Sequence, residues 1–425
     1  LLACTRRRRS AKSCDASSRS ALTAGFPMPE QQMRVVLGAD PLFRPPTGIG
    51  NYTRNLARNL LALQLLEELI LYANGAVFRA DSMASLIDPP IEYTSWTENN
   101  MGLLSKLRDY LASREWALRA YQTVTPMVDR VRLHRYQGAV FHSPNYLLPA
   151  FDGPTVVTIH DLSIQRYPQY HPAERVRFLD ARIHDAAHKA AHIITDSTCV
   201  KTEILEHFGI DDARVTAIPL AAGEEFKPLI EEDCRAVLGA LKIRYKQFFF
   251  FASTIEPRKN LLRICAAYKA LRATGKTDWP IIFAGGAGWK SEAEHLEIQS
   301  LVQRGWAQYL GFVDAATLPI LYSAAGALVF PSIYEGFGLP ALEAQQSGTR
   351  VITSLGTAMA EFASEHDVLV EPLEVDSLIA GMARAVELES LSDGSALPSS
   401  GSALSWQNTA RLTADVYKQA LGASP

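Results

Sequence analysis

The sequence predicts an α/β protein built from two doubly wound domains that face each other across a cleft. Two observations lead to this fold class. Short apolar runs alternate with stretches of helical periodicity along the chain, and this alternation is typical of βαβ units with parallel sheets. The runs also fall into two series of about six, and 425 residues are enough for two or three domains.

The predicted strands come in two series, and predicted helices separate them. The first series comprises 34–39, 67–73, 139–142, 155–160, 192–195 and 215–218. The second comprises 247–252, 280–284, 309–311, 327–330, 350–353 and 368–370. Helical periodicity is found, among other places, at 51–66, 173–191, 198–208, 259–273 and 339–347. Open parallel sheets bind ligands beyond the carboxyl ends of their strands, so the functional prediction concentrates on the residues that follow each strand.

Domain boundaries follow from these series and from changes in composition. The segment 221–245, which contains Pro228 and an acidic run, is the expected junction between the domains. A stretch rich in Ser, Gly and Ala at 391–404 predicts a linker, and the helical spacing at 405–421 predicts a last helix that packs on the first domain. The predicted order is a disordered tail or mis-assigned start 1–32, a first domain 33–225, a second domain 226–400 and a linker with helix 401–425.

The composition excludes several classes of protein. With 48% hydrophobic and 20% charged residues, the chain is neither disordered nor collagenous. Its five cysteines are scattered, odd in number and without a Cys-x-x-Cys pair. This pattern predicts a protein of the reducing cytoplasm without a disulfide framework. Six basic and two acidic residues give the segment 1–32 a charge of +4. Since the whole chain has a net charge of −3, the remaining residues carry −7. A mildly acidic body gives no reason to expect nucleic acid as a partner.

The first 32 residues begin with Leu1 and are rich in Arg and Ser, and three interpretations of them stay open. They resemble a transit peptide, the first four residues resemble a lipoprotein box, or they lie upstream of a true start at Met28 or Met33. We favour the third interpretation, because Met33 leads directly into the first predicted strand. No apolar run in the sequence reaches the roughly 18 residues that a transmembrane helix needs.

The richest motif follows the predicted strand 327–330. It reads Pro-Ser-Ile-Tyr-Glu-Gly-Phe-Gly-Leu-Pro and leads into a helix. Gly336 and Gly338 allow the backbone to approach a ligand closely, and the free N–H groups and dipole of a helix start favour anions or sugar hydroxyls. Glu335 in the loop and Glu343 in the helix add two carboxylates. Taken singly, each glutamate fits a structural role, in a loop or as a helix cap, as well as it fits a role in ligand binding. The combined motif indicates a ligand site.

The spacing Glu335-x7-Glu343 within this motif resembles that of the retaining family 4 glycosyltransferases, which have the GT-B fold of two Rossmann-like domains. The resemblance runs from about Met33 to Leu421. It implies that Glu335 lies near the donor sugar and that Glu343 binds the nucleotide ribose. It also implies that the sugar hydroxyls and diphosphate contact the backbone around Gly336, Phe337, Gly338 and Leu339.

A second motif follows the predicted strand 247–252 and reads Ser-Thr-Ile-Glu-Pro-Arg-Lys-Asn. Cations are unfavourable at a helix start, so the adjacent Arg258 and Lys259 either form a solvated charged turn or bind an anion there. Arginine offers a bidentate fork and lysine a compact charge, which suits a diphosphate. The resemblance implies this second role, since Glu-Pro-Arg-Lys-Asn matches the diphosphate clamp of the family. Ser253 stands where many relatives have glycine.

Three weaker motifs complete the donor site that the resemblance implies. Gly48 and Gly50 open a predicted helix and match the loop that faces the donor diphosphate across the cleft. A dinucleotide site is disfavoured there, because Thr53 replaces the third glycine of that fingerprint. The glycine run 285–288 is either a plain turn or a segment near the nucleotide. Val313 lies in a segment that is similar to the one that contacts the base through its backbone.

Histidines end two predicted strands of the first series. His160, with Asp161 beside it, follows one strand, and a surface histidine with local hydrogen bonds is the alternative reading of this position. The resemblance implies that His160 contacts the donor sugar near the reacting carbon. His142 ends the preceding strand and either lines the acceptor side or serves packing.

Residues 102–136 combine seven basic and three acidic residues with a stripe of Leu, Tyr and Trp. A basic amphipathic helix of this kind can lie on an anionic membrane, which would suit a lipid-linked acceptor. An ordinary pair of cleft-lining helices with a solvated face is the alternative. The sequence thus predicts a cytoplasmic protein, and it leaves peripheral contact with the inner face of the cell membrane as an open prediction.

The predicted function is the transfer of a hexose, with retention, from a sugar nucleotide to a glycan or polyprenyl-linked saccharide. The strings Thr-Gly-Ile-Gly-Asn-Tyr and Ile-Glu-Pro-Arg-Lys-Asn resemble bacterial mannosyltransferases of surface-polysaccharide synthesis, which favours GDP-mannose as the donor. There is no Asp-x-Asp and no His and carboxylate cluster with metal spacing, so neither metal nor cofactor is predicted. Arg258, Lys259 and glycine-loop N–H groups would then stabilise the leaving diphosphate.

Several alternatives stay open at this point. UDP-glucose and a UDP-N-acetylhexosamine stay open as alternative donors, and a GT-B-fold sugar-nucleotide epimerase fits the same donor motifs. A dinucleotide-dependent oxidoreductase is disfavoured by the missing glycine, and a non-catalytic binding module by the complete set of site residues. Two positions depart from the family pattern, because Arg350 replaces a frequent proline and Ala-Glu-Phe-Ala-Ser at 360–364 replaces Pro-Glu-Val-x-Gly.

Overall fold

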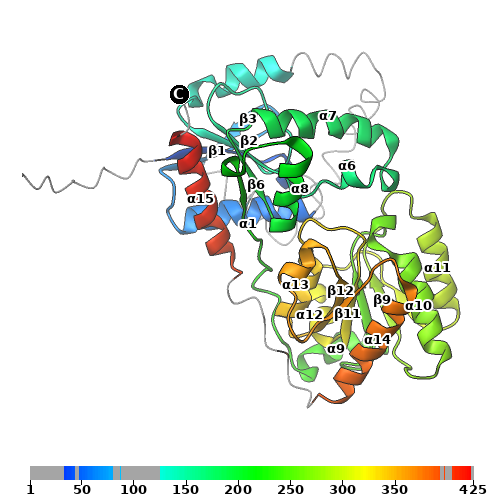
Figure 1. Ribbon diagram of the computed structural model, residues 1–425. Helices are drawn as coiled ribbons and strands as arrows, with labels where there is room; N and C mark the ends of the chain where they lie inside the picture. Colours follow the sequence, from blue (N-terminus) through cyan, green and yellow to red (C-terminus); the bar gives the residue numbers. More distant parts are fainter. Residues whose placement is uncertain are drawn as a thin grey trace, which may run out of the picture. The chain divides into compact units, whose positions relative to one another are not determined.

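The computed structural model describes residues 33–43, 47–79, 87, 125–392, 397 and 404–422. Residues from Met33 onward form one compact unit. It contains two β-sheets, called sheet A and sheet B below, and each has helices on both faces (Figure 1). The α/β, doubly wound fold class is therefore confirmed. The tail 1–32, most of the basic stretch 102–136 and most of the linker 391–404 lie outside the described residues.

Sheet A has seven strands in the order β3-β2-β1-β4-β5-β6-β7. They are β1 Arg34–Gly38, β2 Glu68–Ala73, β3 Ala76–Phe78, β4 Val140–Ser143, β5 Thr155–Thr158, β6 His192–Thr195 and β7 Val215–Ala217. Neighbouring strands are parallel except for β2 and β3. Six of the seven lie where the sequence predicts them.

The antiparallel strand β3 was missed in the sequence analysis. Asn74 and Gly75 lie between β2 and β3 with φ angles of 49° and 74°, which is the backbone of a two-residue hairpin turn. Asparagine and glycine adopt this left-handed conformation at low cost. An Asn-Gly pair between apolar runs is a strong hairpin pattern, so the sequence did contain the information that predicts β3.

Helices cover both faces of sheet A. One layer consists of α1 Gly48–Ala62 and α15 Trp406–Gly422, and the other of α7 Ala173–Lys189 and α8 Thr198–Phe208. Side-chain alternation assigns the strand residues to these layers, since Val156 of β5 packs in the first and Val157 in the second. Figure 1 shows α15, the last helix of the chain, beside α1. Shorter helical turns are η1 Asp40–Phe43, η2 His134–Tyr136, α6 Ser163–Arg166, η3 Pro168–Tyr170 and η4 Asp212–Arg214.

Sheet B has six parallel strands in the order β10-β9-β8-β11-β12-β13. They are β8 Phe249–Ala252, β9 Ile281–Ala284, β10 Ala307–Tyr309, β11 Ala327–Phe330, β12 Arg350–Ser354 and β13 Val368–Val370. Four consecutive phenylalanines at 248–251 are fully buried. A strand with helices on both faces needs apolar side chains in both directions, which explains the three phenylalanines of β8, and Phe248 directly precedes them.

The helices of sheet B form one layer on each of its faces. The layer of α9 Glu231–Leu241, α12 Thr317–Ala324 and α13 Leu339–Gln346 lies opposite that of α10 Leu261–Ala273, α11 Glu292–Gln303 and α14 Val375–Ser390 (Figure 1). The turns η5 Pro257–Lys259 and η6 Ala358–Glu361 lie between strands and helices. α9 falls inside the expected junction 221–245, and the acidic run forms its first turn, where carboxylates complement the helix dipole. The later part of that segment therefore belongs to a helix that packs on α12.

Among the described residues, no helix combines the length and the apolar character needed to cross a lipid bilayer.

Candidate functional site

The predicted site residues gather where the strand order of sheet B reverses. β8 and β11 are neighbours in the sheet, yet the chain continues from β8 to β9 on one side and from β11 to β12 on the other. Such a switch point opens a crevice at the carboxyl ends of the strands, where doubly wound folds bind nucleotides. The segments that leave these two strand ends are 253–260 and 331–338. The topology therefore brings the two richest sequence motifs together.

Glu335 forms a buried ion-pair cluster with Arg258 and Lys259. Its Oε1 lies 2.6 Å from Nζ of Lys259, and its Oε2 lies 3.1 Å from Nη1 of Arg258. Nη2 of Arg258 also donates to Oε1 of Glu256 at 2.7 Å. The four side chains are between 3% and 11% exposed, so the cluster is almost out of contact with water. Glu256 is a member that the sequence analysis did not assign.

The protonation states of this ion-pair cluster follow from burial and from its own charges. Burial alone would raise the pKa of Glu335, but Arg258 and Lys259 outweigh it and lower this pKa to about 2. Burial would lower the pKa of Arg258, yet Glu335 and Glu256 raise it above its usual value. For Lys259 burial prevails, and its pKa is lowered. Nε of Arg258 and Oε2 of Glu256 have no partner among the described residues, which leaves hydrogen-bonding capacity for a ligand.

The backbone around Asn260 positions the two cations. The turn η5 carries them, and α10 begins only after Asn260. Asn260 has a positive φ of 67°, and its Nδ2 donates to the carbonyl groups of Pro331 and Pro372 at 3.0 and 2.6 Å. The predicted helix 259–273 begins slightly earlier than α10, at the second cation. Both cations instead lie in the turn before the helix, held against the loop that follows β11.

His160 follows β5 of sheet A and lies against the loop that carries Glu335. A Cβ atom added to Gly336 would lie 1.8 Å from the carbonyl oxygen of His160, so this approach requires glycine. Nδ1 of the imidazole lies 2.7 Å from Oδ2 of Asp196, and Nε2 lies 2.9 Å from the carbonyl oxygen of Pro144. Burial alone would lower the pKa of His160, but Asp196 outweighs it, and the pKa is raised.

The glycine loop leads into α13 at Leu339. Gly338 has a φ of 102°, and a Cβ atom there would lie 2.4 Å from Cγ of Met359, so both conformation and packing require glycine. Phe337 is buried and packs on Phe362, with ring centroids 5.1 Å apart. The first N–H groups of α13, which have no partner within the helix, are thereby fixed at the switch point.

Glu343 lies in α13 in an environment opposite to that of Glu335. Burial raises its pKa, a hydrogen bond with Tyr322 opposes the increase and Glu225 adds to it, with the result that the pKa is about 7. Its carboxyl group therefore titrates near neutral pH, whereas that of Glu335 stays ionised. Pairs of carboxyl groups whose environments separate their pKa values are typical of functional sites.

Gly48 and Gly50 lie in the first turn of α1 rather than in a loop before it. Thr47 is the N-cap of this helix, and its hydroxyl accepts a hydrogen bond from the N–H of Gly50 at 3.1 Å. The cap moves the helix start upstream of the predicted one. Tyr52, two residues after Gly50 in the same helix, packs edge-on against His160 with ring centroids 5.0 Å apart. The helix start is thereby linked to His160.

Ser253 directly follows β8, and Val313 lies beyond the end of β10 in sheet B. The N–H of Ser253 donates to the carbonyl group of Ala284 at 3.0 Å. A Cβ atom on Gly285 would lie 1.8 Å from the carbonyl oxygen of Ser253, and this close approach accounts for Gly285 by packing alone. Val313 follows β10 and is half-buried, next to Phe312, whose side chain is 75% exposed.

Two residues after β6 hold the site together, and the sequence analysis missed them. Asp196 contacts His160, and the hydroxyl group of Ser197 donates to the carbonyl group of Gly336 at 2.8 Å. One turn of the chain in sheet A therefore contacts both the histidine and the glycine loop of sheet B. The strand-end rule that selected His160 would also have selected these two residues.

Tyr334 and Glu361 make further contacts with the helical layer of sheet A. The hydroxyl group of Tyr334 donates to Oε2 of Glu203 at 2.6 Å and accepts from the N–H of Leu162 at 3.0 Å. The carboxylate of Glu361 accepts from the first two N–H groups of α8 at 3.0 and 2.6 Å, where the helix dipole favours an anion. The segment 360–364, which departs from the family pattern, thus supplies a cap for a helix of the other sheet.

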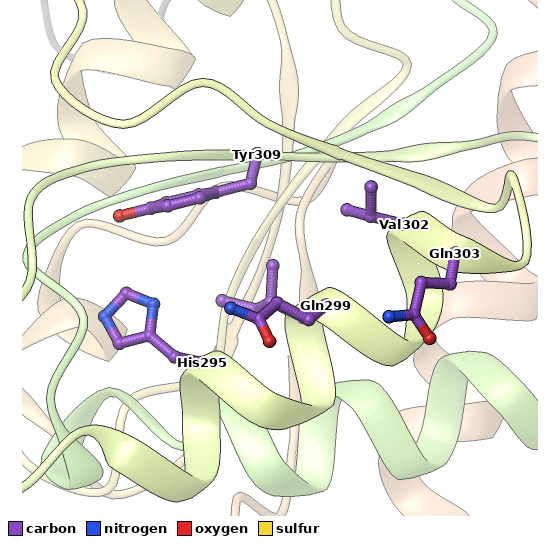
Figure 2. A pocket seen from close by; sticks show the side chains of 6 residues that line it. His295, Gln299, Val302, Gln303 and Tyr309 are labelled. Atoms are coloured by element: carbon purple, nitrogen blue, oxygen red, sulfur yellow. The ribbon is translucent and has the colours of Figure 1, made fainter.

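A pocket of about 380 Å³ lies away from this site, on α11 beside β10. Figure 2 shows His295, Gln299, Val302 and Gln303 of α11 and Tyr309 of β10 around it. None of the predicted site residues lines this pocket, so we assign it no part in the site. In the described ranges, no group of three or more His, Cys, Asp and Glu side chains is arranged to hold a metal ion.

Comparison with known proteins identifies the family. The family model Glycosyltransferase Family 4 matches residues 46–222, and the model Glycosyl transferases group 1 matches residues 240–394, which include all of sheet B. O-antigen chain mannosyltransferase B of Escherichia coli is 29% identical over 388 residues, which cover 91% of this chain and 100% of that protein. Serotype-specific mannosyltransferase WbdA of Escherichia coli is 30% identical over 306 residues, which cover 67% of this chain and 36% of WbdA.

Solved structures of glycosyltransferases share the fold. A glycosyltransferase from Rickettsia africae has a TM-score of 0.62 and 14% identity, with coverage of 93% of this chain and 100% of that one. Sucrose-phosphate synthase from Thermosynechococcus elongatus has a TM-score of 0.62 and 20% identity, with coverage of 92% and 100%. These likenesses confirm the predicted GT-B fold. The two family models and the mannosyltransferase relatives show that the chain belongs to the family 4 glycosyltransferases and is a hexosyltransferase.

Proposed function

We propose that the enzyme transfers mannose from GDP-mannose to a glycan or polyprenyl-linked saccharide, with retention of the anomeric configuration, in the synthesis of a surface polysaccharide. The observation that carries the proposal is the buried pair of cations, Arg258 and Lys259, at the switch point of sheet B. A nucleoside diphosphate is the ligand that this charge and this position suit. The choice of mannose is supported by the mannosyltransferases among the relatives of the chain, two of which are described above.

Each half of the cleft has a part in this proposal. The second domain, 226–400, binds the donor. Arg258 and Lys259 hold the diphosphate, and Glu335 accepts hydrogen bonds from the donor sugar. Glu343 binds the ribose. The rest of the donor is positioned by backbone groups of Ser253, Val313, Gly336, Phe337, Gly338 and Leu339. The first domain, 33–225, holds the acceptor and presents the helix start at Gly48 and Gly50 to the diphosphate.

The proposed chemistry is electrostatic. The acceptor oxygen forms a bond to the anomeric carbon while the bond from that carbon to the diphosphate oxygen breaks on the same face of the sugar. The diphosphate leaves with the bonding electrons. The proton of the acceptor hydroxyl passes to the diphosphate oxygen that has left the anomeric carbon. Arg258, Lys259 and the cationic His160 stabilise the charge that develops there, and their buried surroundings strengthen this effect. Glu335 completes the catalytic pair with His160 by holding the sugar.

The proposal includes contact with an anionic membrane, where a lipid-linked acceptor would lie. Residues 125–133 are helical and form the described end of the basic stretch 102–136. Met127 and Val131, one turn apart, are 68% and 76% exposed, and Arg132 beside them is also exposed. Exposed apolar groups next to basic ones suit an anionic lipid surface. We place the enzyme in the cytoplasm, because the described cysteines Cys199, Cys234 and Cys265 are all free thiols.

A thermal-shift screen followed by product analysis tests this function. GDP, UDP and ADP and their sugar conjugates are compared, and we expect GDP and GDP-mannose to raise the melting temperature selectively. GDP-mannose is then incubated with a mannose-terminated lipid-linked oligosaccharide, and the anomeric configuration of the product is read by NMR. An α-mannoside is expected. Selective stabilisation by UDP, a β-mannoside, or epimerised donor formed without acceptor would each contradict the proposal.

A further inference from the structure

His160 and Asp196 form a side-by-side pair at the carboxyl ends of two adjacent strands. β5 and β6 are parallel neighbours, and the N–H of Ile159 donates to the carbonyl group of Ile194 at 2.9 Å. In this register Thr158 of β5 is opposite Ile194 of β6. His160 and Asp196, each two residues further along, therefore lie side by side at the same edge of the sheet. Oδ2 of Asp196 lies 2.7 Å from Nδ1 of His160, and the two side chains are 4% and 15% exposed. The contact is therefore short, buried and fixed by the sheet.

The hydrogen-bond partners of His160 determine its protonation state. Nε2 faces the carbonyl oxygen of Pro144 at 2.9 Å, and a carbonyl group can only accept, so Nε2 carries a hydrogen. Nδ1 faces a carboxylate oxygen, which also accepts, so a second proton lies between Nδ1 and Asp196. A ring with both nitrogens protonated is an imidazolium. Burial raises the pKa of Asp196, but Asp196 also raises the pKa of His160 above its ordinary value, so we assign the shared proton to the ring, which gives a cationic histidine paired with an anionic aspartate.

Asp196 has no other hydrogen-bonding role within the part of the chain that the structure describes. Its second oxygen, Oδ1, is buried without a partner there. A buried carboxylate oxygen without a partner is costly, so a residue placed only for stability would normally satisfy both oxygens. The sole contact that this side chain makes through a hydrogen bond is the one with His160. The residue is therefore placed for the histidine.

The other titratable groups that face His160 do not supply this charge. Tyr52 packs edge-on against the ring from α1, and burial raises its pKa well above neutral pH. His142 lies on β4, and burial lowers its pKa to about 3, so it stays neutral. Asp161 is the next residue in the chain and acts on His160 only as a weaker charge, while its Oδ1 accepts from the N–H of Ser163. Asp196 is the anion in direct contact.

We propose that Asp196 is a positioning residue that keeps His160 in its imidazolium form and orients that cation toward the departing diphosphate. The proposal rests on the proposed function, because it gives His160 a place at the donor. Asp196 itself does not touch the donor. Its effect is on the charge of His160, and through that charge on the transition state, in which the diphosphate gains negative charge. Ground-state binding of the donor depends much less on it.

The substitution Asp196→Asn separates this role from a merely structural one. Asparagine has the same shape, and its amide can donate to Nδ1 of a neutral His160 while Nε2 still donates to Pro144. The pair then has the same total charge as the wild-type ion pair, but the cation is lost from the ring. Asp129→Asn is the matched control, because Asp129 is a buried aspartate on a helix beside sheet A and accepts from Tyr72 of β2 at 2.5 Å.

The experiment combines NMR of the ring with steady-state kinetics of the whole enzyme. Two-bond 15N–1H spectra report the protonation of His160, whose signals are assigned by their loss in His160→Asn. We expect both ring nitrogens to be protonated at pH 7.5 in the wild type and in Asp129→Asn, and a neutral ring in Asp196→Asn. With GDP-mannose, Asp196→Asn should lower kcat about 100-fold with little change in KM. The loss of activity on raising the pH should also move to lower pH.

The two readouts distinguish failure of this proposal from failure of the proposed function. A neutral His160 in the wild type overturns the proposal whatever the donor is, since the NMR measurement needs no substrate. A wild-type pH profile in Asp196→Asn, or full activity in His160→Asn, overturns it through the kinetics. If UDP-linked sugars prove to be the donors, the GDP-mannose assignment fails, and the same kinetic comparison is made with the true donor.

Discussion

The carboxylate of Glu335 lies 2.6 Å from the ammonium group of Lys259, and its other oxygen lies 3.1 Å from the guanidinium of Arg258. The sequence presents these residues as separate ligands of one donor, but in the fold they are partners of one another. A diphosphate that binds the two cations must share them with Glu335 or replace it. Donor binding is therefore coupled to the orientation of the very carboxylate that we assign to the sugar.

Removing this carboxylate should destabilise the protein in a way that the donor reverses. Glu335→Gln leaves two buried cations with only Glu256 as a carboxylate partner, which should lower the free energy of unfolding by about 3–5 kcal/mol. GDP restores negative charge to the cations, so the thermal shift that it causes should be larger in the variant than in the wild type. Glu297→Gln is the control, because Glu297 pairs with Lys269 on the surface of the same half, where an ion pair contributes little. Equal melting temperatures and equal GDP shifts in Glu335→Gln and wild type would contradict the coupling.

Donor affinity should depend on pH through Glu343. Its pKa is about 7, and ribose hydroxyl groups donate to the ionised form, so lowering the pH protonates the group and weakens binding. Between pH 8 and pH 6 the dissociation constant of GDP-mannose should rise about tenfold. Titration calorimetry measures this, and the sugar-linked diphosphate avoids the titrating terminal phosphate of GDP. In Glu343→Gln the pH dependence should vanish; a wild-type pH dependence in that variant would exclude this role for Glu343.

Tyr334 should affect both stability and catalysis, because it joins the glycine loop to the first domain. Tyr334→Phe removes the hydroxyl group that bridges Leu162 and Glu203, and the groups left behind cost about 1–3 kcal/mol. Since the next residue is Glu335, we also expect a lower kcat/KM. Tyr72→Phe, which removes the hydrogen bond from β2 to Asp129 on the neighbouring helix, should lower stability alone. The idea fails if both variants lose kcat/KM equally, or if Tyr334→Phe loses none.

Membrane contact should depend on the exposed apolar pair Met127 and Val131. Introducing Glu at both positions places two negative charges where the apolar side chains would enter the lipid surface. Flotation with vesicles that contain anionic lipid should recover the wild type but not this double variant. Leu296→Glu is the control, since Leu296 is 67% exposed on α11 and should have no effect. No flotation of the wild type would end the membrane proposal.

The fold class and the composition of the site were predictable because both depend on local patterns. Alternating apolar runs predict parallel strands, and ligands bind where those strands end, so the loops with Arg258 and Glu335 could be selected from the sequence. The antiparallel strand β3 was equally predictable from Asn74 and Gly75, and its omission was an error of interpretation. The start of α1 was misplaced because the cap formed by Thr47 was not recognised.

The pairings within the site could not be predicted, because they join residues that are far apart in the chain. No local pattern says that Glu335 pairs with Lys259 rather than binding the donor alone, or that Asp196 holds His160. The electrostatic contrast between Glu335 and Glu343 likewise comes from burial and neighbours, not from their spacing. The roles of these residues at a donor, and the domain boundaries at 225 and 400, stay predictions.

The central claim is that Arg258 acts on the diphosphate of a mannose donor, and the rate of mannose transfer from GDP-mannose tests it most directly. Arg258→Gln keeps a polar side chain in the cluster, and circular dichroism verifies that the variant is folded. Arg244→Ala is the control, since Arg244 is an exposed arginine of the same half, paired with Asp278. We predict that Arg258→Gln lowers kcat/KM at least about 100-fold while Arg244→Ala leaves it unchanged. A folded Arg258→Gln enzyme with wild-type kcat/KM would contradict the account.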